Sequence, residues 1–199
     1  MHDGETLKRA AYAGVTQGGK QMNIDEFWRV IDQVHEQSAG VMDTKCELLK
    51  SELDKLSDDD LKSFSNHFDT VDVQAYSWSL WGAAYVMNGG CSDDSFSDFR
   101  ATLISLGRNV YDAALRDPNS LAQVEYDDND SCYEGFQYVR NDVLESRFGD
   151  IPSREIEFPT SPSGEEWDED SVEELYPELK YLEEVSAEVT NPKPWWKFW

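Results

Sequence analysis

The side chains of this sequence best suited to bind a cation are three aspartates with the spacing DDxxxD: Asp93, Asp94 and Asp98. Hard cations take carboxylate oxygens as ligands, and residues four apart share a helix face, so Asp94 and Asp98 could hold one ligand. Ser92, however, is placed to cap a helix that starts here, and the helix dipole stabilises carboxylates in a first turn by about 0.3–1 kcal/mol each. Capping accounts for two of the three aspartates, and we therefore favour a structural role and predict no metal site.

Cys91 lies directly before the same helix start, where a helix dipole lowers the pKa of a thiol. The adjacent carboxylates act in the opposite direction, and a Cys–His mechanism would need His35 or His67 beside the thiol. The other cysteines, Cys46 and Cys132, are distant in the sequence, and an odd count without a signal peptide is typical of reduced thiols in the cytoplasm. The sequence contains no motif for a nucleophile–base pair, a phosphate loop or a metal site, so it predicts no catalytic residue and no cofactor.

Three aromatic residues, Trp78, Trp81 and Tyr85, have the spacing of one helix face. They could line a ligand pocket, with Arg100 or Arg108 at its rim in contact with an anion. The same spacing is the ordinary apolar stripe of a helical core, and we favour packing as the role of these rings.

A dense acidic run surrounds Trp167, from Gly164 to Glu174. Runs of this kind are usually solvated and weakly ordered. The alternative is a docking strip for a basic partner, with Trp167 as its aromatic anchor.

The last nine residues, 191–199, combine two lysines with four aromatic side chains and contain no acid. Exposed together, these rings would form a sticky patch. We favour a peptide motif read by a partner protein; the alternatives are docking into a groove of the same chain and a weak contact with a membrane interface. The four aromatic residues are Trp195, Trp196, Phe198 and Trp199.

The composition limits the choice of partners. The 199 residues contain 17 Lys and Arg against 41 Asp and Glu, a net charge of −24. This charge repels phosphates at long range, so we expect no nucleic-acid partner, and it favours a basic protein instead. The 39% hydrophobic content supports a core, while the lack of an apolar run of about 18 residues argues against a membrane span.

The elements that must position these residues are helices, because apolar residues recur at helical spacing and strand signals are poor. We predict a mostly α fold: a single compact multi-helix domain at residues 22–148, after a loose N-terminal arm at 1–21. An acidic, proline-rich extension with one short helix follows at 149–190, and the aromatic peptide at 191–199 ends the chain. The expected helix starts are Asn23 or Asp25, a capping box at 44–47, Ser57 and Ser92. Further helices are expected from Ala75 through Tyr85 to a stop at Gly89-Gly90, at 132–144 and at 172–182.

Three stretches resemble a bacterial family known as domain of unknown function 4240. They are IDEFWRVID at residues 24–32, LWGAAYVMNGGCSDDSFSDFR at 80–100 and LISLGRNVYDAALRDPNSLA at 103–122. The resemblance covers about residues 22–145 and implies a small, mostly helical cytosolic domain. The family has no established catalytic residues to transfer to this chain.

From the charge and the lack of catalytic motifs, we expect a non-enzymatic, acidic binding or regulatory protein of the cytoplasm. Neutralisation of a basic toxin or nuclease would fit, because opposite charges steer such partners together. The alternative is a small-ligand or metal-dependent enzyme domain that uses Asp93, Asp94, Asp98 and Arg100.

Overall fold

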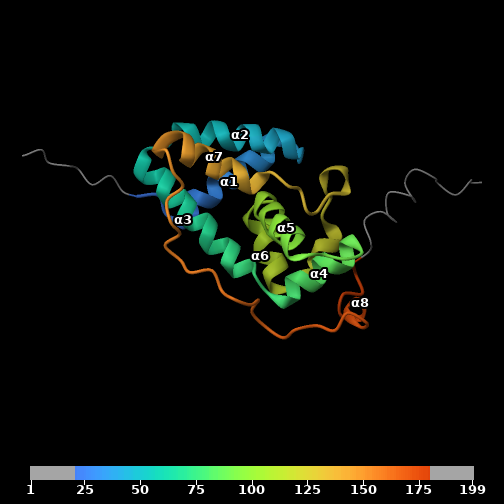
Figure 1. Cartoon of the computed structure of the whole chain (residues 1–199). Helices are drawn as coiled ribbons and strands as arrows, with labels where there is room; N and C mark the ends of the chain where they lie inside the picture. Colours follow the sequence, from blue (N-terminus) through green and yellow to red (C-terminus); the bar gives the residue numbers. More distant parts are fainter. Residues whose placement is uncertain (1–20, 180–199) are drawn as a thin grey trace, which may run out of the picture.

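Helices form over most of the stretches in which apolar residues recur at helical spacing. The computed structural model describes residues 21–179, in which no strand forms, and the prediction of a mostly α, single multi-helix domain is confirmed (Figure 1). The helices are α1 (Ile24–Ser38), α2 (Met42–Lys55), α3 (Asp58–Ala75), α4 (Trp78–Asn88), α5 (Asp93–Ser105), α6 (Arg108–Arg116), α7 (Phe136–Phe148) and α8 (Val172–Leu175), with short 3-10 helices η1 (Pro118–Gln123) and η2 (Asp127–Asn129).

Helix α5 is the centre of the domain. Helices α1, α3, α4, α6 and α7 all pack against it, and α8 lies against α4 (Figure 1). Its apolar residues Phe96, Phe99 and Leu103 are buried, at the helical spacing seen in the sequence. Residues 101–105 of α5 are buried on all sides, as expected for a helix segment that is hydrophobic or small all round.

Local caps fix several helix starts where the sequence places them. Asn23 accepts from the backbone N–H groups of the first turn of α1 and forms a capping box with Glu26. Ser57 caps α3, and the Ser92 hydroxyl accepts from the Ser95 N–H at 3.2 Å at the start of α5. These predictions depend on residues close in the chain, and they are confirmed.

The start of α2 differs from the prediction. The capping box expected at residues 44–47 is wrong, since the helix already begins at Met42 and has no side-chain cap from its own N-cap residue. The Met42 N–H is instead satisfied by the Asp127 carboxylate at 2.8 Å. A carboxylate 85 residues away in the chain thus replaces the local cap.

The helix expected to run from Ala75 through Tyr85 forms as α4 and ends before Gly89 as predicted, but its start is wrong, because the chain breaks between α3 and α4. Ser77 caps α4, accepting from the Leu80 N–H at 3.2 Å. Ser163 of the extension forms backbone bonds on both sides of the break, donating to the Tyr76 carbonyl at 3.0 Å and accepting from the Trp78 N–H at 2.9 Å. The break is therefore where the extension crosses the helical domain.

The last two helices are shifted or shortened relative to the prediction. The helix predicted at 132–144 is α7, which starts after Gly135 and ends at Gly149, both with positive φ. The helix predicted at 172–182 is described only as the short α8, and Pro177 follows it closely. Proline cannot continue a helix, which explains why α8 stops. Residues 180–182 lie outside the described residues.

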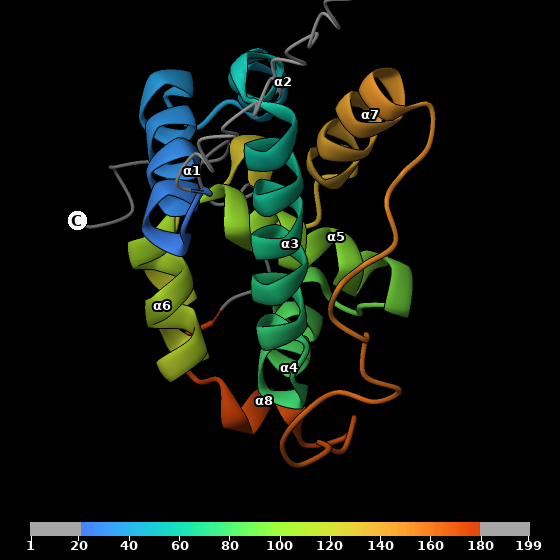
Figure 2. The same ribbon diagram turned by 90° about the vertical axis from the view of Figure 1, so that its left-hand side faces the viewer.

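The extension after α7 packs along the domain. Figure 2 shows it running from the end of α7 past α5 to α8. Phe158 lies 4.9 Å from the Tyr76 ring, centroid to centroid, and Val172, Tyr176 and Leu179 are buried in the main core cluster. The described part of the extension is thus held by apolar contacts despite its acidic composition.

Candidate functional site

The aromatic residues singled out in the sequence form a row of packed rings. Trp78 stacks on Trp81 at 5.3 Å, and Trp81 stacks on Phe96 of α5 at 4.9 Å. Trp167 of the extension joins the row, 6.0 Å edge-on from Trp78 and 5.0 Å from Tyr85. The structure therefore brings together four candidates, all of them half-buried, and the packing role favoured for the three on α4 stays a prediction.

The extension approaches α4 closely because residue 82 is glycine. A Cβ atom on Gly82 would lie 2.8 Å from the Tyr176 hydroxyl oxygen and 3.0 Å from Cδ1 of Trp167. Tyr176 uses this space to donate its hydroxyl to the Ser79 carbonyl at 2.7 Å. This role of Gly82 was not predicted from the sequence, although a glycine inside a helical pattern is a signal of close packing.

A groove of about 570 Å³ lies where the extension, α4 and η1 meet. Its apolar surface includes Trp167, Leu175 and Tyr176, of which Leu175 is 56% exposed. We call it the acid-rimmed groove, because the carboxylates that line it are Asp117, Glu165, Glu166 and Asp168. It is the place where the acidic run and the aromatic row meet.

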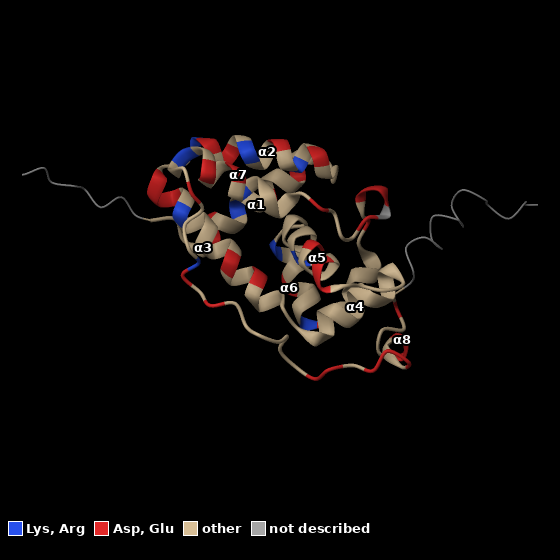
Figure 3. Cartoon of the chain, in the orientation of Figure 1, with Lys and Arg blue, Asp and Glu red and all other residues tan. Residues whose placement is uncertain are grey.

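The acids that the extension contributes to this groove have no cationic neighbours in the sequence. Residues 165–178 contain eight carboxylates, and there is no Lys or Arg from 155 to 179 (Figure 3). All eight are exposed, and within residues 21–179 none of them forms an ion pair. Glu169 accepts a hydrogen bond from the Tyr85 hydroxyl, which raises the pKa of Tyr85. The acidic run thus forms an exposed, charged surface next to the packed aromatic rings of Tyr85 and Trp167.

A second hollow, the arginine cleft, is about 420 Å³ in volume and lies between the start of α5 and the extension. Arg100 lines it but is only 4% exposed, and its Nε donates to the Asp72 carboxylate at 2.8 Å. The guanidinium lies over the rings of Phe96, Tyr76 and Phe158 at 4.8–5.5 Å. Arg100 is therefore a buried, stacked ion-pair partner and not the rim residue of an aromatic pocket. Arg108, the other predicted rim residue, donates to Asp25 at 2.7 Å, between α6 and α1.

The DDxxxD aspartates are divided between two places. Asp93 and Asp94 line the arginine cleft, whereas Asp98 accepts from Gln137 of α7 at 2.6 Å. Burial is the main cause that raises the pKa of Asp98. In the described part of the chain, no group of three or more His, Cys, Asp or Glu side chains is placed to hold a metal ion.

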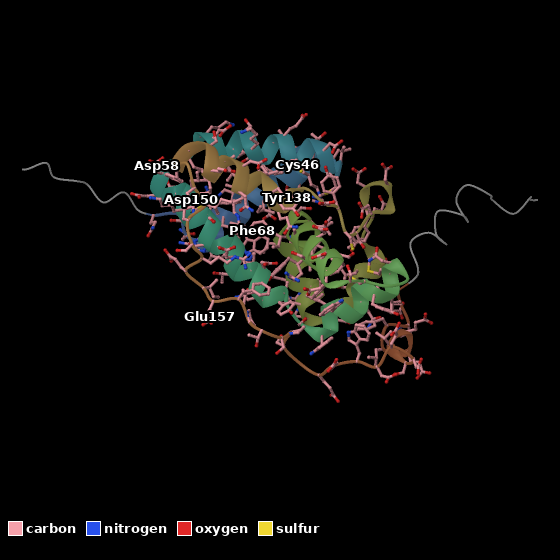
Figure 4. All side chains as sticks on the ribbon, viewed as in Figure 1. Cys46, Asp58, Phe68, Tyr138, Asp150 and Glu157 are labelled. Carbon is pink, nitrogen blue, oxygen red and sulfur yellow. The ribbon has the colours of Figure 1, made fainter. Side chains whose placement is uncertain are left out.

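A pair of buried acids on α3 ties the extension to the domain. Asp69 accepts from Arg140 of α7 at 2.7 Å and lies 3.4 Å from Nε of Arg154 in the extension. The guanidinium of Arg140 also lies 4.7 Å from the centre of the Phe68 ring, which is buried in the domain. Figure 4 shows Phe68 in the domain and Glu157, an exposed residue, on the extension. Together with the Asp72–Arg100 ion pair, this network holds Arg154 of the extension against α3 beside the arginine cleft.

The cysteines are free thiols. A hydrogen bond with Cys132 is the main cause that raises the pKa of Cys91, and burial adds to it. His67 is engaged elsewhere, with its Nε2 3.0 Å from the Met22 carbonyl oxygen. The same hydrogen bond lowers the pKa of Cys132, so the shifts belong to the pair of thiols, and the structural role of Cys91 stays a prediction.

The remaining predicted site residues, Trp195, Trp196, Phe198 and Trp199, lie outside the described residues. Within residues 21–179, no helix is both long and apolar enough to cross a membrane.

Comparison with known proteins gives one match. A family model described as "Protein of unknown function (DUF4240)" matches residues 22–146. No curated protein and no solved structure matches the chain. The acid-rimmed groove combines residues inside and outside the matched range, since Trp167, Leu175 and Tyr176 follow it.

Proposed function

This chain belongs to the family of proteins of unknown function DUF4240, and we propose that it is a non-enzymatic, acidic binding protein that holds a basic protein partner in the acid-rimmed groove. The observation that carries the proposal is an apolar floor, exposed at Leu175, that adjoins a rim of carboxylates forming no ion pair within residues 21–179.

The chemistry of the groove matches a lysine or arginine side chain. Such a side chain lays its apolar stem along an aromatic surface while its charged head stays in water. On Trp167 the stem would pack against the indole, where a cation over the ring gains about 0.5–2 kcal/mol. The head would reach the neighbouring carboxylates of Glu166 or Asp168, for which charge-assisted hydrogen bonds are the stronger kind.

The surrounding acids add a long-range attraction. Eight exposed carboxylates between residues 165 and 178 repel one another, and a cationic partner relieves that repulsion. Their field reaches about 8 Å at physiological ionic strength, which is enough to steer an approaching basic surface. Association should therefore slow as salt is added.

Binding of this kind would neutralise the partner. A basic toxin or nuclease held through its cationic surface cannot offer that surface to nucleic acid. The groove presents recognition chemistry, aromatic rings with carboxylates, so we propose binding and not catalysis. The proposal places the protein in the bacterial cytoplasm.

The test compares two variants of equal charge in the full-length chain. The rim variant carries Glu165→Gln, Glu166→Gln and Asp168→Asn. The control variant carries the same changes on α2 and α7, at Glu47, Glu145 and Asp142, which are exposed and form no ion pair with described residues.

Each protein is immobilised and exposed to a bacterial lysate, and the retained proteins are eluted with a salt gradient. We expect the wild type and the control variant to retain the same basic proteins, and the rim variant to lose them. Equal retention by all three proteins would contradict the proposal, because net charge alone would then explain binding.

A further inference from the structure

We propose that residues 192–199 of this chain, the lysine and tryptophan peptide, dock into the acid-rimmed groove and must be displaced before a partner binds. This inference concerns the same groove as the proposed function, and its regulatory consequence rests on that function. The docking itself rests on the chemistry of the groove and on the distance along the chain.

The peptide is complementary to the groove in charge and in apolar character. It carries Lys193 and Lys197 with no acid, and its aromatic rings include Trp195 and Trp196. The groove offers carboxylates that form no ion pair among the described residues, around an apolar floor that is exposed at Leu175. Lysines that flank paired tryptophans would meet the rim while the rings cover the exposed floor at Leu175.

The attachment point of the peptide lies at the groove itself. Tyr176 lines the groove, and the Leu179 N–H bonds to the Tyr176 carbonyl at 3.0 Å. Leu179 is buried in the core, so the last described residue lies beside the groove. The connection from Leu179 to Trp195 spans at most about 55 Å when fully extended, which is ample for a return to the adjacent groove.

A short connection makes even weak docking effective. Sites joined by short linkers meet at effective concentrations on the order of millimolar. A peptide that bound the separate groove with a dissociation constant of about 1 mM would therefore occupy it for much of the time when attached. This requirement is modest for two lysines and several aromatic rings.

Two other hollows of the described domain fit the peptide less well, because each contains two arginines. In the arginine cleft, Arg100 and Arg154 offset most of the charge of its three aspartates. In the hollow beside α1, Arg29 and Arg108 oppose three acids, and the Asp25 carboxylate is already paired with Arg108 at 2.7 Å. In the acid-rimmed groove the carboxylates have no such partner among residues 21–179, and it is also the hollow next to Leu179.

The consequence for function is competition. A groove occupied by residues 192–199 is available to a partner for only a fraction of the time, so the apparent affinity falls by that fraction. Removing the tryptophans should raise the affinity for a cationic probe by about two- to tenfold.

The docking is tested by zero-length carbodiimide cross-linking of the full-length chain. The reagent joins a lysine amine to a carboxylate only when the two are in contact. Mass spectrometry of an equal mixture of ¹⁴N- and ¹⁵N-labelled protein then separates links within one molecule from links between molecules. We expect links within one molecule from Lys193 and Lys197 to Asp117, Glu165 or Asp168.

A variant with Trp195→Ala and Trp196→Ala keeps both lysines, and its groove links should fall at least fivefold. Tyr138→Ala, which removes an exposed ring on α7, is the control and should leave the links unchanged. Links spread evenly over other exposed acids, such as Glu47 and Glu145, would overturn the inference. Links found only between molecules would overturn it as well, since a second copy would then be the occupant.

A titration separates this inference from the proposed function. The probe is the peptide acetyl-Lys-Trp-Lys-Trp-amide, added to the wild type and to the double tryptophan variant. Tighter binding by the variant supports the inference. Equal binding by both proteins, lost in the rim variant, would overturn the inference and leave the proposed function standing. No binding by either would count against the proposed function as well.

Discussion

Replacing Gly82 with alanine would push the extension away from α4. In isolation the change favours the helix, because alanine is better than glycine in a helix interior by about 1 kcal/mol. The new Cβ, however, would lie 2.8 Å from the Tyr176 hydroxyl oxygen, 2.9 Å from its Cε2 and 3.0 Å from Cδ1 of Trp167. Contacts this short cannot persist, so both rings must move.

The stability lost by displacing these rings should exceed the stability gained from the higher helix propensity of alanine. Moving Tyr176 breaks its hydrogen bond to the Ser79 carbonyl, which contributes about 0.5–1.5 kcal/mol. Full burial of a large apolar side chain contributes about 1.5–3 kcal/mol, and displacement of two rings forfeits part of that for each. We expect Gly82→Ala to lower the free energy of unfolding by about 1–3 kcal/mol in urea denaturation, and to make residues 160–175 more susceptible to protease.

A double-mutant cycle with Tyr176→Ala isolates the contact. Once the tyrosine ring is gone, Gly82→Ala should destabilise much less, and the helix preference should become visible. If Gly82→Ala stabilises the protein in both backgrounds and leaves protease protection intact, the reasoning that glycine admits the extension is refuted.

Three further predictions concern the fold. Arg100→Met should cost about 3–5 kcal/mol because it leaves Asp72 buried without a partner, and adding Asp72→Leu should recover most of that loss; a double variant as unstable as the single one would contradict this ion-pair account. Ser92→Ala should lower the free energy of unfolding by about 0.5–2 kcal/mol through loss of the α5 cap, and no change in urea denaturation would count against the cap. Burial lowers the pKa of Lys45 from 10.5 to about 8, so between these pH values the folded state has released a proton that the unfolded chain still holds. The free energy of unfolding should therefore rise with pH across that window relative to Lys45→Met, and parallel pH curves for the two proteins would refute the shift.

Sequence reasoning succeeded where the determinants are local. The caps Asn23, Ser57 and Ser92 each bond to an N–H group two or three residues away, so spacing alone identifies them. It failed where a distant segment decides the outcome. Asp127 sets the start of α2 from 85 residues away, and Ser163 stabilises the break before α4 from 87 residues away. No periodicity within a short window contains such information.

In the candidate site, too, local spacing predicts some features, and packing between distant segments decides the others. The shared face of Trp78, Trp81 and Tyr85 follows from helical spacing, but their contact with Trp167 depends on how the extension returns across α4. Likewise, the DDxxxD spacing places Asp98 one turn from its neighbour, yet Gln137 of another helix engages it outside the arginine cleft. Tertiary packing, not spacing, decides which of these side chains share a site.

The central claim, that the acid-rimmed groove binds a basic partner, is tested most directly at Trp167. Its indole N–H is buried and has no hydrogen-bond partner within residues 21–179, so its NMR resonance should respond to any change in the packing of the groove floor. The measurement is a ¹H–¹⁵N titration of the full-length chain with acetyl-Lys-Trp-Lys-Trp-amide at low and high salt, with Trp28 on α1 as the internal reference. The account predicts a saturable shift of the Trp167 resonance that weakens with salt and is lost in the rim variant, while the Trp28 resonance stays in place. A Trp167 resonance that does not move, or that moves only as much as that of Trp28, would contradict it.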